Sequence, residues 1–458
     1  MTQLKQYYFS AILSFFAITA VFSLITGTAW AKAEHNKVIC RVETDRAILP
    51  AGDSQTVILK ITLDAPAAPV NIKRPAVNLS LVLDQSGSMN GTKIKKAKAA
   101  AIEALTRLGL QDIFSVIVYD TNVHTIVPAQ KTENIQGIIN TIQQIRAGGS
   151  TALFGGVSQG AAEIRKNLES DFVHRIILLS DGLANVGPRM PGDLGRLGAA
   201  LIKENISVTT IGVGTDYNED LMAQLAQKSD GNIYFVESGV DLPRIFAAEL
   251  GDVLNVVAKK VKVTITLPDN IQAVKIIGRE GRIRNNQVEL YMNQLYGNQE
   301  KYALIEVNIP ESRSWSNPGT KIKIAHADVI YDNPFTNTRE QSTGVSYASF
   351  SKDSKKIAKS ANIDVVREYQ LNLNALAQEK AIKLSDKGNK KEAVEELKQS
   401  AARLKKIGTL YEDDKMLEQA GAIEIQADRI ESQGMSKKSR KLLRTESYQM
   451  KNQQMIKK

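Results

Sequence analysis

Two rhythms of apolar and polar residues divide the chain. Near its start and again in its second half, apolar residues occupy every second position, as in the runs 57–63, 261–267 and 303–309. This alternation predicts strands with one buried face. Because the short strands near the start cannot bury a core alone, we expect the two flanks, 36–76 and 256–350, to form one β-sandwich together.

Between these flanks, in residues 77–254, short apolar runs alternate with helical patterns. The runs include 78–83, 113–118, 175–179 and 207–211. Near-continuous apolar strands that alternate with helices are typical of a parallel sheet covered on both faces. The sequence therefore predicts a doubly wound, Rossmann-like α/β domain inserted into the sandwich.

Beyond residue 352 the apolar spacing becomes helical. From Met416 to Ile430 apolar residues recur at intervals of three and four, which indicates one buried stripe. Gly388, Gly408 and Gly434 punctuate the stretch, so we expect three or four antiparallel helices in a helical hairpin region over 352–435.

Charge changes this picture at the end of the chain. Lys and Arg number 59 against 49 Asp and Glu, a formal net charge of +10. Residues 436–458 hold eight basic residues and one acidic residue, Glu446, so most of that charge lies in a short basic tail. A solvated, frayed end is the leading interpretation, and adhesion to an anionic envelope surface is the functional alternative. Nucleic acid is not an expected partner, because the basic residues are not interleaved with the aromatic residues on which bases would stack.

Residues 1–33 are typical of an export signal. A short polar start with Lys5 precedes an apolar stretch over 8–25, and small residues at 29, 31 and 33 form two overlapping cleavage sites. We expect an exported protein, periplasmic or secreted to the cell surface. An uncleaved membrane anchor is the alternative, because the apolar stretch approaches the roughly 20 residues that span a bilayer. The single cysteine, Cys40, excludes an intrachain disulfide and a thiolate metal cluster.

The strongest local signal is the segment 84–91, Asp-Gln-Ser-Gly-Ser-Met-Asn-Gly, which follows an apolar strand and precedes a helix. In an open parallel sheet, ligands bind beyond the carboxyl ends of the strands. One carboxylate and two hydroxyl groups at alternate positions of such a loop converge on one point, and hard oxygen ligands of this kind suit Mg²⁺. The segments 148–151 and 180–182 bring further oxygens to the same edge.

Five of these residues, in order and on the expected strand ends, resemble the complete metal-ion-dependent adhesion site of the von Willebrand factor type A family. They are Asp84, Ser86, Ser88, Thr151 and Asp181. The resemblance extends over 77–254. Together with the export signal, the lack of any possible intrachain disulfide favours a bacterial, exported member of the family.

The resemblance implies a domain that binds Mg²⁺ or Mn²⁺. Asp84 and the two serines would ligate the metal directly or through water, Thr151 would join and leave the ligands, and Asp181 would act through water. An Asp or Glu of a protein partner would fill the remaining coordination position. Asp120, at another strand end of the same sheet, would either hydrogen-bond the ligands or cap its own turn.

Two simpler interpretations compete with this one. Asp84 and the serines could cap the helix that begins near Thr92. An enzyme with a serine nucleophile would need a positioned base, and the chain offers only four histidines for that role. A nucleotide-binding enzyme would need a phosphate-binding glycine loop, and the sequence contains no such motif. We therefore expect a non-enzymatic protein that binds a partner through its metal. The alternatives are an envelope scaffold whose helical region makes the contact while the metal is only structural, and an accessory subunit of an ATPase machine.

Overall fold

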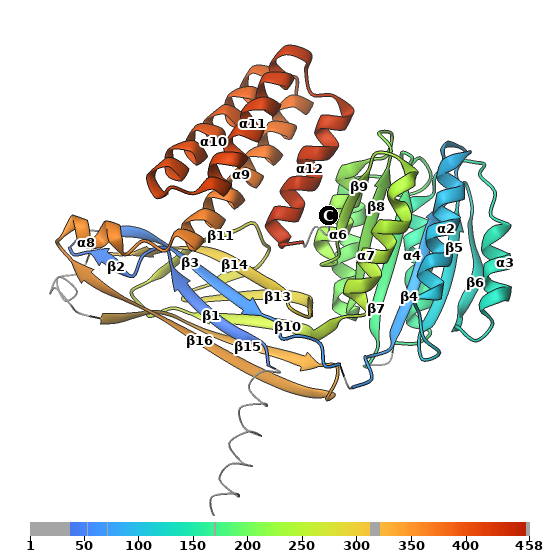
Figure 1. The fold of residues 1–458 in the computed structure, drawn as a ribbon, viewed down its shortest axis with the longest axis horizontal. Coiled ribbons are helices and arrows are strands. Elements are labelled where there is room, and N and C mark those ends of the chain that lie inside the picture. The colour runs from blue at the N-terminus through green and yellow to red at the C-terminus, as the bar shows by residue number, and fades with distance from the viewer. Residues whose placement is uncertain (1–36, 53, 71, 169–170, 312–320, 455–458) are drawn as a thin grey trace, which may run out of the picture.

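The computed structural model describes residues 37–454 with the exception of 53, 71, 169–170 and 312–320. The predicted signal segment, 1–33, lies outside the described residues. Figure 1 shows three parts: an α/β domain, a pair of largely antiparallel sheets beside it, and a group of helices that contacts both. None of the helices in the described part of the chain combines the length and apolarity that crossing a membrane requires.

The α/β domain is built on a six-stranded sheet in the order β6-β5-β4-β7-β8-β9. The strands are β4 (Val77–Asp84), β5 (Ile113–Tyr119), β6 (Val123–Lys131), β7 (Val173–Ser180), β8 (Ile206–Val213) and β9 (Ile233–Val236). The pairs are parallel except for β5–β6. All residues of β4, β5, β7 and β8 are buried, as their near-continuous apolar runs predict.

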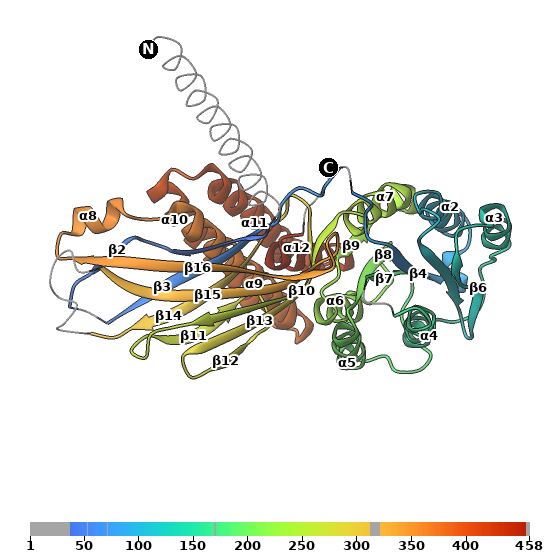
Figure 2. The same ribbon diagram turned by 90° about the horizontal axis from the view of Figure 1, so that it is seen from below.

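Helices cover both faces of this sheet. They are α2 (Thr92–Thr106), α3 (Ile135–Gln143), α4 (Leu153–Arg165), α5 (Pro191–Leu201), α6 (Glu219–Lys228) and α7 (Leu242–Val253). Figure 2 shows α2, α3 and α7 on one face and α4, α5 and α6 on the other, and a separate hydrophobic cluster lies under each group. The doubly wound α/β prediction is confirmed. β4 lies between β5 and β7, and the strand order runs outward from β4 in both directions, which makes its carboxyl end a topological switch point.

The two flanks of this domain share two further sheets. The four-stranded sheet contains β1 (Ile39–Thr44), β3 (Gln55–Asp64), β14 (Glu300–Ile309) and β11 (Gln272–Ile277) in that order. The six-stranded sheet contains β12 (Arg282–Arg284), β13 (Gln287–Tyr296), β10 (Val256–Thr266), β15 (Lys321–Asn333), β16 (Thr338–Ser351) and β2 (Ile48–Pro50). One hydrophobic cluster holds Leu59 and Ile305 of the first sheet together with Val263 and Val329 of the second. Residues before and after the α/β domain thus form a single unit.

The helical region contains α8 (Ser354–Lys359), α9 (Ile363–Asp386), α10 (Lys390–Tyr411), α11 (Asp414–Gln433) and α12 (Lys437–Asn452). The stripe from Met416 to Ile430 is buried, as its spacing predicts. Gly388 and Gly434 end helices in the left-handed backbone region that glycine favours. The prediction for Gly408 is wrong: it lies inside α10, where a Cβ would come within 3.1 Å of Met416 and Leu417. Its missing side chain permits close helix packing instead of a turn.

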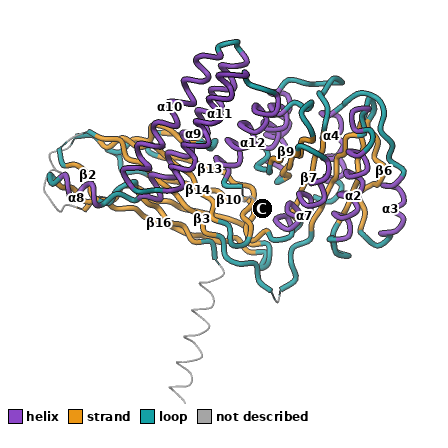
Figure 3. Tube along the Cα trace, turned by 45° about the horizontal axis from the view of Figure 1, so that its top comes forward, coloured by secondary structure: helices purple, strands orange, loops and turns teal. Residues whose placement is uncertain are grey.

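The prediction of a frayed basic tail is wrong for residues 437–452. Figures 1 and 3 show them as α12, between the other helices and the α/β domain, and the side chain of Ser436 caps the helix. Arg440 forms ion pairs with Glu219 and Asp220 of α6 and with Asp386 of α9. Arg440 of α12 therefore joins two parts of the same chain. The alternative contact of 436–458 with an anionic envelope surface stays a prediction, because Lys437 and Lys438 of α12 are 73% and 48% exposed.

Candidate metal centre

Asp84 is the last residue of β4, and its buried carboxylate is held from two sides. Its Oδ1 accepts a hydrogen bond from the Ser86 amide at 2.8 Å, and its Oδ2 accepts one from Ser180 Oγ at 2.7 Å. Burial raises the pKa of Asp84 above its ordinary value, because desolvation disfavours the charged form. A positive charge placed beside this carboxylate would offset that cost.

Hydroxyl groups connect Asp84's loop to the end of β7. Ser86 Oγ and Ser88 Oγ lie 3.0 Å apart, and Ser88 Oγ donates to Asp181 Oδ1 at 2.6 Å. Ser86 and Asp181 are buried, whereas Ser88 is exposed. The site thus combines two buried carboxylates with hydroxyl groups of which only that of Ser88 belongs to an exposed residue.

Thr151 reaches the same place from the segment before α4. Its amide donates to Asn185 Oδ1 at 2.8 Å, and its carbonyl accepts from the Asn185 amide at 3.1 Å. Gly182 lies between these groups: a Cβ there would be 3.0 Å from Thr151 Oγ1, 3.3 Å from Ser88 Oγ and 3.6 Å from Ser86 Oγ. Three hydroxyl oxygens therefore surround space that the absence of a side chain leaves free. The structure brings together all five predicted site residues.

The chemistry of these groups fits a hard divalent cation. Two carboxylates and three hydroxyl groups provide oxygen ligands only, which Mg²⁺ prefers. Within the described ranges, no group of three or more His, Cys, Asp or Glu residues could hold a metal ion. A cation at this edge would therefore depend on Ser86, Ser88 and Thr151 for ligands beyond the two carboxylates.

The helix-capping alternative does not hold for α2. That helix has Gly91 at its N-cap, and no side chain provides a cap hydrogen bond there. Asp120 acts on the supporting loops instead of on the ligands: its carboxylate accepts from the Asn122 amide at 2.8 Å and from Gln85 Nε2 at 2.9 Å. It caps its own turn and fixes the residue that follows Asp84.

Sequence reasoning missed two charged or polar contacts at this site. Ser180, which hydrogen-bonds Asp84, is visible only as the residue before Asp181. Lys93, in the first turn of α2, donates from Nζ to Asp181 Oδ2. A lysine in the helix turn directly after a ligand loop is the signal that could have found it.

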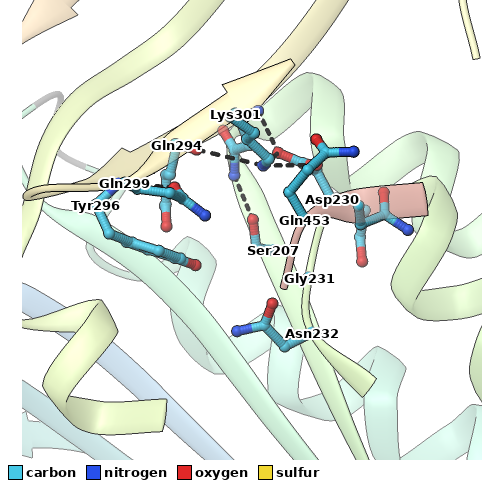
Figure 4. Close-up of polar contacts among 12 residues, drawn as sticks. Ser207, Asp230, Gly231, Asn232, Gln294, Tyr296, Gln299, Lys301 and Gln453 are labelled. Carbon is cyan, nitrogen blue, oxygen red and sulfur yellow. Dashed lines mark hydrogen bonds and ion pairs between the residues drawn. The ribbon is translucent and has the colours of Figure 1, made fainter. Parts of the chain in front are cut away.

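The amino ends of the same strands carry a different polar cluster, shown in Figure 4. Asp230 accepts hydrogen bonds from Lys301 Nζ at 3.3 Å and from the Asn293 amide at 2.6 Å, and Arg279 forms an ion pair with it at 3.8 Å. Burial lowers the pKa of Lys301 to about 8, although Asp230 opposes that shift. At Gly231, a Cβ would overlap the Val208 carbonyl. This cluster joins the α/β domain to β13, β14 and the loop after β11, and basic groups of the same chain balance the charge of Asp230.

The strand order and the oxygen-lined carboxyl edge of the α/β domain agree with its resemblance to the von Willebrand factor type A family. The family model for the von Willebrand factor type A domain matches residues 78–248. The uncharacterized protein sll0103 of Synechocystis sp. is 33% identical over 169 residues, which cover 36% of this chain and 39% of that protein. The chain thus spans well under half of the length of this relative.

Two solved structures are similar over most of the chain. A von Willebrand factor type A protein from Catenulispora acidiphila has a TM-score of 0.67 at 15% identity, covering 86% of this chain and 90% of that one. The ArnB paralog VWA2 from Sulfolobus acidocaldarius has a TM-score of 0.59 at 17% identity, covering 91% and 98%. The fold beyond the α/β domain therefore also has counterparts among solved structures.

Proposed function

We propose that this chain is an exported, non-enzymatic protein whose von Willebrand factor type A domain, inserted into a β-sandwich, binds Mg²⁺ and holds a protein partner through it. Asp84, Ser86, Ser88, Thr151 and Asp181 would hold the cation, and Mn²⁺ fits the same ligands. The observation that carries the proposal is the ring of three hydroxyl oxygens around the side-chain-free position of Gly182, next to two buried carboxylates.

The ligand set favours an external carboxylate as the partner group. Three of the five ligands are neutral, so the cation would keep part of its positive charge. When bound, it supplies an electrostatic anchor for an Asp or Glu of the partner. Leu183, the residue after Gly182, is 60% exposed. This apolar side chain favours a partner that presents an apolar residue next to its acidic one.

The placement of the described histidines supports a non-enzymatic role. His174 is buried and stacks on Phe172, and His326 lies beside Asp328 on β15, at 3.1 Å. His124 lies on β6, the edge strand of the α/β sheet. Among the residues that the structure describes, no histidine hydrogen-bonds the serines of the site, so neither serine has the positioned base that a nucleophile needs.

Export gives this proposal its setting. The signal-like segment 1–33 favours a periplasmic or cell-surface location, where divalent cations and envelope proteins are both within reach. Amino-terminal sequencing of the mature protein tests this part: a chain that begins near residue 32 or 34 is expected, and a cytoplasmic chain that retains the segment would overturn it.

Affinity capture from native envelope extracts tests the metal-dependent contact. The wild-type chain should retain a partner in Mg²⁺ and release it in chelator, and D84A should retain none in either condition. D241A is the matched control, since its carboxylate belongs to the same domain and is 54% exposed. A partner that D84A retains as well as the wild type does, regardless of chelator, would contradict the metal-mediated contact.

A scaffold role for the helical region is the second candidate. Leu410 of α10 and Ile425 of α11 are 67% and 64% exposed, and apolar side chains of this size favour a protein contact. Under this alternative, I425D would abolish capture of the partner while D84A would not. The opposite pattern supports the metal-mediated function.

A further inference from the structure

Lys93 brings a positive charge into the candidate metal centre. Its Nζ donates to Asp181 Oδ2, and its side chain is 31% exposed while that of Asp181 is fully buried. A Cβ on Gly214, after β8, would lie 3.5 Å from the same nitrogen. The ammonium group thus lies between the carboxyl ends of β7 and β8, next to the ligands and still reachable by solvent.

Both carboxylates of the site are engaged by protein groups. Asp181 accepts from Lys93 on one oxygen and from Ser88 on the other, and Asp84 accepts from the Ser86 amide and from Ser180. The two acceptors differ in one respect: Asp84 has only neutral donors, whereas Asp181 has a full positive charge beside it. Asp181 is therefore neutralised before any cation arrives.

This charge changes the balance of the loaded site. Two carboxylates and one ammonium group leave a formal charge of −1, and a divalent cation turns it into +1. A single carboxylate from a partner then brings the total to zero. Without the lysine, the two carboxylates alone would neutralise the cation, and little electrostatic attraction for a partner would remain.

We propose that Lys93 sets two affinities of the centre. Its charge lowers the affinity for the divalent cation and raises the affinity of the loaded site for one carboxylate. This inference rests on the proposed function, because it assigns a role to Lys93 at the same site. The lysine is a positioning and charge-setting residue, not a ligand.

A merely structural role for Lys93 predicts the opposite sign. If the lysine only held Asp181 toward Ser88, removing it would release the carboxylate and weaken cation binding. If its charge dominates, removing it lowers the repulsion between ammonium and cation and tightens binding. The direction of the change therefore separates the two roles.

Calorimetric titration of Mg²⁺ into the full chain tests the proposal with K93M, K93R and K95M. Lys95 is the matched control, because it lies on the same helix, carries the same charge and is exposed. We expect K93M to bind Mg²⁺ about tenfold more tightly than the wild type. K93R and K95M should stay within about twofold of the wild type, because both keep the charge beside Asp181.

The second arm measures the carboxylate. With Mg²⁺ saturating, N-acetyl-aspartyl amide is titrated and followed by NMR shifts of the loop amides. K93M should bind this probe about tenfold more weakly than the wild type, while K93R keeps wild-type affinity. Thermal unfolding of each variant without metal shows whether the chain is folded.

The outcomes separate this inference from the proposed function. Weaker or unchanged Mg²⁺ binding in folded K93M overturns the role of Lys93 and leaves the metal site standing. If K93M binds Mg²⁺ and the wild type does not, the Lys93 ammonium group takes the place of the metal in the natural chain. That result would overturn metal-dependent adhesion by the wild type. Absence of binding in every variant overturns both.

Discussion

The amino edge and the carboxyl edge of the α/β sheet, where the strands begin and end, contain similar residues with different roles. At the amino ends of the strands, Asp230 is surrounded by Lys301, Arg279 and the Asn293 amide, so groups of this chain balance its charge. At the carboxyl ends, Asp181 has one lysine and one serine as partners, and hydroxyl groups border the space left by Gly182. Both edges place an aspartate next to a lysine.

The difference teaches that a buried charge is not by itself a sign of a binding site. At the amino edge every member of the group around Asp230 comes from this chain, so the charges join its parts. At the carboxyl edge three hydroxyl oxygens surround the side-chain-free position of Gly182, and two carboxylates have a single lysine between them, so a cation from outside can complete the group. Hydroxyl oxygens beside carboxylates that keep a net negative charge are what mark the candidate site.

The largest effect on stability is expected at the amino edge. D230A would leave Lys301 and Arg279 buried without their acidic partner, and it should lower the free energy of unfolding by about 3–5 kcal/mol. Denaturant unfolding of the metal-free chain measures this loss, with exposed D241A as the control. Similar stability of the two variants would contradict a structural role for the amino edge.

A somewhat smaller effect is expected where α12 docks. R440A removes one side chain from Glu219, Asp220 and Asp386, and it should lower the free energy of unfolding by about 2–3 kcal/mol. K438A on the same helix removes only a pair with exposed Glu237, and it should cost less than about 1 kcal/mol. Equal losses in the same unfolding experiment would mean that α12 is not held by the acidic residues of α6.

At the carboxyl edge, the main expected change is in Mg²⁺ affinity and not in stability. G182A would place a methyl group among the three hydroxyl oxygens, so Mg²⁺ affinity should fall by about tenfold or more while the metal-free chain loses less than about 1 kcal/mol. G192A, whose Cβ would make only an ordinary contact of 3.6 Å with Arg196, is the control. Unchanged affinity in G182A, measured by calorimetry, would show that the cation does not use this space.

The smallest effect is expected at Asp120, which supports the ligand loop from outside. D120N keeps one acceptor oxygen for Gln85 or Asn122, so Mg²⁺ affinity should change by less than about threefold. A loss as large as that of D84A in the same titration would make Asp120 a ligand, contrary to its contacts.

The sequence predicted the α/β domain, and the placement of the five candidate residues at one sheet edge, for a physical reason. Fully apolar runs such as 78–83 leave few alternatives to a buried parallel strand, and the rule that loops after such strands share one edge brings Asp84 and Asp181 together. The contacts of Ser180 with Asp84 and of Lys93 with Asp181 could not be predicted from the local pattern, because the partners lie far apart along the chain.

The end of the chain could not be predicted from its local pattern. The basic residues of α12 looked solvated because their partners, Glu219 and Asp386, lie 221 and 54 residues from Arg440. Gly408 was misjudged for a related reason, since its neighbours on α11 make it a packing position within a helix. Export and the β-sandwich assignment stay predictions.

Calorimetric titration of Mg²⁺ into the wild-type chain and into D84A tests the central claim most directly. The account predicts saturable binding at one site in the wild type and its loss in D84A, with both chains folded in the absence of metal. Equal binding heats in the two chains, or no heat in the wild type, would contradict a metal centre built on Asp84.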